Sequence, residues 1–141
     1  MILDDFTAGD GEPHKCEASY QLLDMPVTIN RRHATVHAGD GVTLEVVTHA
    51  ALATTSGAVA PEYMGFRPCG DRLASEHIPA PVLSIYGYGE RVNLATVLYP
   101  TPDGIAPEIA VKCDESSFTV TLDGVEHKFM RDEEFLKTEK V

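Results

Sequence analysis

The stretch FTVTLDGVEHKF, residues 118–129, decides the fold class. Apolar and polar residues alternate on both of its halves, which is the period of a half-buried β-strand. Asp123-Gly124 separates the halves, and this dipeptide tolerates the positive φ angles of a type I′ turn. The sequence therefore predicts a β-hairpin. Its expected apolar face is Phe118, Val120, Leu122, Val125 and Phe129.

Turn signals of the same kind recur along the rest of the chain, at 9–11, 39–41, 87–89 and 102–104. Runs of β-branched and aromatic residues lie between them, so an antiparallel β-sandwich of about eight or nine strands in two packed sheets is expected. In 91–99 both faces carry apolar side chains, which predicts a central strand covered on both sides. The other predicted strands are 1–6, 14–23, 32–38, 42–48, 81–87 and 107–113.

Two segments depart from this rhythm. Residues 49–80 are rich in Ala, Thr, Ser, Gly and Pro without a sustained period. A connection of this length is usually functional or mobile, or it contains a short element. In 131–141 Asp132, Glu133 and Glu134 come early and the lysines late, the order that a helix dipole favours, so one or two helical turns are predicted there.

The composition is that of an acidic globular chain. Its 141 residues and 43% hydrophobic content suit one packed domain, so a single β-sandwich domain over 1–141 is expected. The net charge is −11, and Arg31-Arg32 is the only adjacent basic pair. Nucleic-acid binding is not expected, because affinity for phosphates comes from clustered Lys and Arg.

The compartment is expected to be the cytoplasm. Met1-Ile2-Leu3 leads directly into two aspartates, without the basic region of a signal peptide. No apolar segment approaches the ~20 residues of a membrane helix, so no membrane partner is expected. The cysteines Cys16, Cys69 and Cys113 form no close pair, which favours free thiols over disulfides or zinc ligands.

No catalytic residue, metal ligand or cofactor is assigned from local motifs. His33 and His37 would chelate a metal on a helix, but on a strand four residues span about 13 Å, too far to share one ion. Nucleophile-elbow, P-loop and dinucleotide motifs are missing from the sequence. Cys69 lies near Arg67 and Arg72, which could lower its pKa, but no histidine stands beside it. An ordinary loop cysteine is the favoured interpretation.

The candidate binding residues lie in 49–80. Tyr side chains stack on sugar rings, and Arg pairs with carboxylate or sulfate groups. The alternative is that these residues attach the long segment to its own sandwich, and both interpretations stay open. The predicted substrate-binding residues are Tyr63, Arg67, Arg72 and His77, with Glu76 beside them.

Three segments, in order along the chain, resemble the C-terminal β-sandwich region of heparinase II/III-like polysaccharide lyases. They are ILDDF (2–6) followed by Gly9-Asp10-Gly11, His14 and Tyr20-Gln21-Leu22; SEHIPAPVL (75–83); and TVLYP (96–100). The resemblance implies a relation to enzymes that cleave uronic-acid polysaccharides by β-elimination, some of them periplasmic. Their catalytic Tyr and His come largely from a helical toroid and its junction with the β-domain. This sequence has no toroid, so no catalytic residue is carried over.

The expected function is therefore a non-catalytic β-sandwich module, structural or weakly carbohydrate-binding, without activity as an isolated chain. Its expected partners are an acidic polysaccharide or oligosaccharide, a lyase helical domain, or a second copy pairing through residues 1–6. The alternative is a small standalone cupin-type metal-binding β-barrel protein or enzyme. A third interpretation is a subunit-interface domain that works only in a complex.

Overall fold

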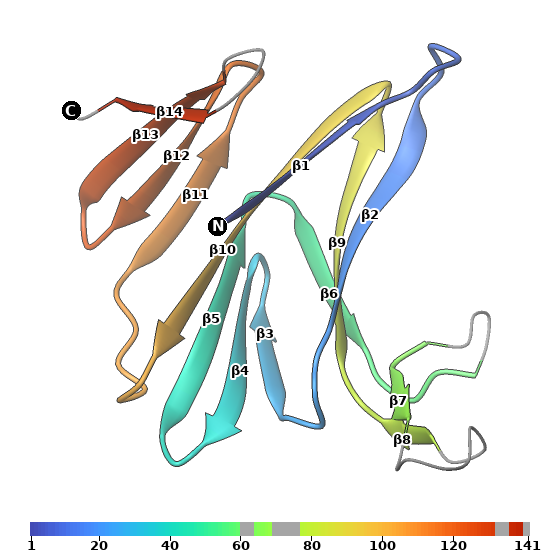
Figure 1. The fold of residues 1–141 in the computed structure, drawn as a ribbon, viewed down its shortest axis with the longest axis vertical. Helices are drawn as coiled ribbons and strands as arrows, with labels where there is room; N and C mark the ends of the chain where they lie inside the picture. Colours follow the sequence, from blue (N-terminus) through green and yellow to red (C-terminus); the bar gives the residue numbers. More distant parts are fainter. Residues whose placement is uncertain (60–63, 69–76, 132–135, 140–141) are drawn as a thin grey trace.

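The computed structural model describes residues 1–59, 64–68, 77–131 and 136–139 (Figure 1). None of these residues forms a helix, and so none forms one that could cross a membrane. The strands are β1 (Ile2–Thr7), β2 (His14–Gln21), β3 (Val27–Asn30), β4 (His33–Gly39), β5 (Val42–Thr48), β6 (Ala51–Thr55), β7 (Phe66–Pro68), β8 (His77–Pro79), β9 (Val82–Gly89), β10 (Arg91–Thr101), β11 (Ile109–Cys113), β12 (Ser117–Leu122), β13 (Val125–Arg131) and β14 (Leu136–Glu139).

The predicted all-β, antiparallel fold class is confirmed. A central five-stranded sheet has the order β1-β10-β5-β4-β3, and a three-stranded sheet has the order β2-β9-β6. A four-stranded sheet runs β11-β12-β13-β14, and β7 pairs with β8. The expectation of about eight or nine strands in two sheets was too low, because the described residues alone form fourteen strands in four sheets. The strands β3, β6, β7 and β8 are too short to show a period in turn-rich sequence.

The three larger sheets lie in layers, with the central sheet in the middle. One core joins it to the three-stranded sheet through Leu83 and Ile85 of β9 and Val92 and Leu94 of β10. A second core joins its other face to the four-stranded sheet, around Ala95, Val97, Phe118 and Val120. β10 pairs with both β1 and β5, so 91–99 is a central strand covered on both sides, as predicted.

The hairpin at 118–129 is confirmed. Leu122 pairs with Val125, and Asp123 and Gly124 have φ angles of 48° and 81°, as a type I′ turn requires. The rings of Phe118 and Phe129 stack with centroids 4.7 Å apart. Val125 pairs with Leu122 and so lies on the predicted face, but it is 59% exposed at the free end of the hairpin and does not belong to the core.

The two irregular segments contain strands. Within 49–80, β6 pairs with β9 and β7 pairs with β8, so this segment does hold short elements. The helical turns predicted for 131–141 are wrong in 136–139, where β14 pairs with β13. The edge of β13 offers unpaired backbone groups, and pairing with them outweighs the weak charge preference of a helix end.

Candidate functional site

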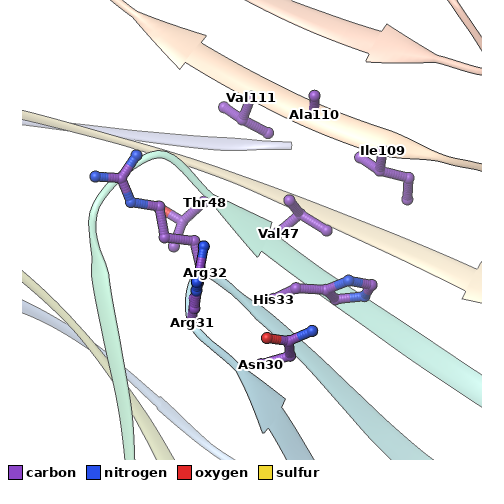
Figure 2. A pocket seen from close by; sticks show the side chains of 9 residues that line it. All are labelled: Asn30, Arg31, Arg32, His33, Val47, Thr48, Ile109, Ala110 and Val111. Carbon is purple, nitrogen blue, oxygen red and sulfur yellow. The ribbon is translucent and has the colours of Figure 1, made fainter.

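A cleft with a distinctive chemistry lies where the central sheet meets the four-stranded sheet. Its volume is about 750 Å³, and it is formed by the β3–β4 turn, the end of β5 and the start of β11. Figure 2 shows the β11 side chains on one side of Val47 and those of Asn30 and His33 on the other. The lining residues are Asn30, Arg31, Arg32, His33, Val47, Thr48, Ile109, Ala110 and Val111.

The β3–β4 turn presents two adjacent arginines to this cleft. Asn30 pairs with His33, so Arg31 and Arg32 are the only residues of the turn. Arg31 has a φ of 57°, a left-handed conformation that is uncommon for a residue other than glycine. The amide of Thr48 donates a hydrogen bond of 3.0 Å to the Arg32 carbonyl oxygen. This bond attaches the turn to the end of β5 and fixes the backbone from which both arginines project.

The cleft is basic although the protein is strongly acidic. None of the described residues that line it is acidic, while Arg31 and Arg32 are both exposed. Neither arginine forms an ion pair with any residue that the structure describes. In a chain of net charge −11, a concave surface with two unpaired guanidinium groups attracts anions locally.

A buried carboxylate positions the histidine of the cleft. The Nε2 atom of His33 lies 2.7 Å from Oε2 of Glu45, and Glu45 is only 3% exposed. The hydroxyls of Thr35 and Thr43 each donate to Glu45 at 2.7 Å. Burial alone would raise the pKa of Glu45, but the hydrogen bonds from Thr43, Thr35 and His33 together hold it below its ordinary value.

The tautomer of His33 follows from this arrangement. Glu45 is ionised at neutral pH because its pKa is lowered, and an ionised carboxylate can only accept hydrogen bonds. Nε2 of His33 must therefore carry the hydrogen that it donates to Glu45. In the neutral ring, Nδ1 is then the acceptor. His33 thus contributes an oriented imidazole to a cleft whose other polar groups are mainly donors.

The opposite wall of the cleft is apolar. Ile109 and Val111 of β11 pack against the core beneath the four-stranded sheet, and Val47 of β5 is only 5% exposed. A cleft with an apolar wall facing guanidinium, amide and imidazole groups suits a ligand with an apolar ring face and an acidic substituent. Nothing in this chemistry requires a metal, and the described ranges contain no group of three or more His, Cys, Asp or Glu that could hold one.

The binding residues predicted in 49–80 stay a prediction. Tyr63 and Arg72 lie outside the described residues, as do Cys69 and Glu76. Arg67 is on β7 and His77 on β8, where Pro68 pairs with His77, so their backbones are neighbours, but their side chains lie outside the described part. Figure 1 shows β7 and β8 away from the β3–β4 turn, so these positions and the basic cleft are separate regions.

Sequence reasoning missed the cleft, although one signal for it was present. Arg31-Arg32 is the only adjacent basic pair of the chain, and it served only as evidence against nucleic-acid binding. Recognising β3 would have placed this pair in a hairpin turn, where both side chains are exposed. The contribution of β11, almost eighty residues further along the chain, had no local signal.

Comparison with protein-family models, with curated proteins and with solved structures finds no match for this chain. The resemblance to heparinase II/III-like lyases therefore stays a prediction.

Proposed function

We propose that this protein is a non-catalytic module that binds an acidic oligosaccharide in the cleft between the β3–β4 turn and β11. The observation that carries the proposal is the pair of arginines, Arg31 and Arg32, which lack an acidic partner among the described residues at the wall of a concave site. A binding site for a neutral or cationic ligand would have no use for two uncompensated guanidinium groups.

The chemistry of the walls supports a sugar as the carrier of the acidic group. The planar guanidinium group binds a carboxylate or sulfate through two parallel hydrogen bonds. The amide of Asn30 can both donate to and accept from ring hydroxyls, and Ile109 and Val111 offer an apolar surface to the C–H face of the ring. The volume of about 750 Å³ falls within the usual range for small-ligand sites.

The direct test is titration calorimetry with a uronate disaccharide and a neutral disaccharide of similar size. We expect binding of the acidic ligand alone, weakening as salt is raised because the arginines are exposed. The double variant Arg31→Gln, Arg32→Gln should lower the affinity by about a hundredfold or more, because it removes at least two charge-assisted hydrogen bonds of ~1.5–3 kcal/mol each.

The matched control is Arg91→Gln. Arg91 is also exposed and forms no ion pair with a described residue, but it lies at the start of β10 and does not line the cleft. Its replacement should leave the affinity unchanged. Equal affinity for the acidic and neutral disaccharides, or equal losses in the control and the double variant, would contradict the proposal.

The proposal agrees with the implied relation to polysaccharide lyases, which act on uronic-acid polymers. A helical lyase domain as partner, and self-association through β1, stay predictions. β1 is an edge strand of the central sheet, because β10 is its only partner among the described strands.

A further inference from the structure

A second polar surface adjoins the cleft on the central sheet. On β3, β4 and β5 alternate residues face opposite sides, and one set, which includes Ile29, Ala34, Val36 and Val46, packs into the core against the three-stranded sheet. The other set forms what we call the polar face. It consists of Thr28, Asn30, His33, Thr35, His37, Thr43 and Glu45.

Hydrogen bonds between neighbouring strands fix these side chains. Glu45 accepts from His33, Thr35 and Thr43. The hydroxyl of Thr28 on β3 lies 3.3 Å from Nε2 of His37 on β4. The polar face therefore presents hydroxyl and imidazole groups in set positions, so binding a ligand to it would cost little ordering of side chains.

The outer part of the polar face is open. The core beneath the four-stranded sheet draws its described residues from β1, β10, β11, β12 and β13, and none from β3 or β4. Figure 1 accordingly shows β3 and β4 extending away from β11–β14. Thr28, Asn30 and His37 are exposed. Asn30 and His33 belong both to the polar face and to the cleft, so the two surfaces are continuous.

We propose that the polar face extends the binding site, so that the ligand is a chain of several sugar rings lying along β3 and β4. This inference rests on the proposed function, because the arginines of the cleft supply the charge that anchors one acidic ring. From His33 to His37 the strand spans about 13 Å, enough for further rings beyond the first. Hydroxyl and imidazole N–H groups can donate hydrogen bonds to the hydroxyl and carboxylate oxygens of these further rings.

The test measures affinity against ligand length, using oligogalacturonates of two, four and six residues. We expect the affinity to rise by about tenfold from the dimer to the tetramer, the effect of two added hydrogen bonds. The double variant Thr28→Val, His37→Ala should abolish that rise and leave the dimer affinity unchanged. The matched control is Thr7→Val, His14→Ala, which changes two exposed residues of the same types on β1 and β2.

The outcomes separate the two proposals. Intact dimer binding with no gain in affinity at greater length would overturn the extended site and leave the proposed function standing. A gain that survives in the polar-face variant would also overturn it, because the longer chain would then follow another path. Failure of every oligogalacturonate to bind would overturn the proposed function as well. Heteronuclear NMR spectra of each variant show whether it is folded.

Discussion

The hairpins β3–β4 and β12–β13 have turns of the same length but opposite character. Asp123-Gly124 closes the second with the residue types that tolerate positive φ angles. Arg31-Arg32 closes the first, and Arg31 adopts a φ of 57° without the conformational freedom of glycine. The residues of the Asp-Gly turn suit its positive φ angles, whereas the positive φ of Arg31 lowers the stability of the fold. Such a turn at the wall of a basic cleft is expected where the residues are kept for ligand binding and not for stability.

The largest effect is expected in the core of the β12–β13 hairpin. Phe118 is 1% exposed and stacks on Phe129, so Phe118→Ala should lower the free energy of unfolding by about 3–5 kcal/mol. Val125, in the same hairpin, is 59% exposed, and Val125→Ala should cost less than about 0.5 kcal/mol. Urea unfolding followed by circular dichroism measures both. Similar losses in the two variants would mean that the apolar face of this hairpin is assigned wrongly.

The next largest effect is expected in the β3–β4 hairpin, where Glu45 holds His33 and makes the stability depend on pH. The pKa of Glu45 is lower in the folded protein than its ordinary value of 4.5, so in the unfolded state this group binds protons more readily. Its contribution to stability is therefore complete well above pH 4.5 and is lost as the pH falls through the lower folded pKa. The protein should lose stability in acid partly through this one carboxyl group.

Glu45→Gln tests that contribution. The amide nitrogen would face hydroxyl groups that now donate to a carboxylate, so we expect a loss of about 1–3 kcal/mol at neutral pH. The loss should shrink in acid, because the wild-type protein then loses the same interaction. Glu126→Gln, at an exposed position of β13, is the control and should change little at any pH. A constant loss for Glu45→Gln across the pH range would contradict the assigned ionisation.

The same two hairpins show what could be predicted from the sequence. The β12–β13 hairpin was predicted correctly because both strands alternate over several residues and Asp-Gly marks the turn. β3 was missed because Val27–Asn30 has only four residues, follows Pro26, and precedes a turn without glycine. The exposure of Val125 could not be predicted, because alternation identifies a face of a strand but not where the neighbouring sheet ends.

The cleft could not be predicted because its walls come from three distant parts of the chain. Residues 30–33, 47–48 and 109–111 meet only through the packing of the four-stranded sheet on the central one. The Glu45–His33 contact is likewise a product of pairing between β4 and β5. The spacing of residues along a strand shows that His33 and His37 are too far apart to share one ion, but it does not identify the carboxylate on the neighbouring strand that holds His33.

The smallest change in stability is expected when the turn residues themselves are replaced, and it tests the comparison of the two hairpins most directly. Gly124 has a φ of 81°, and a Cβ atom added there would meet nothing within 4 Å. Gly124→Ala should therefore lose about 1 kcal/mol through backbone conformation alone. Arg31→Gly should instead raise the free energy of unfolding by up to ~1 kcal/mol, because glycine adopts the left-handed conformation without steric cost. The gain is limited by the greater freedom that glycine adds to the unfolded chain.

Arg31→Gly should at the same time weaken binding of the uronate disaccharide, because it removes one of the two guanidinium groups. Denaturant unfolding and calorimetry on the same preparations measure the two effects together. A variant that is more stable and binds less tightly would show that Arg31 is kept at a conformational cost for the sake of the ligand. If Arg31→Gly instead destabilises the protein as much as Gly124→Ala does, Arg31 contributes to the fold, and the contrast between the two turns fails.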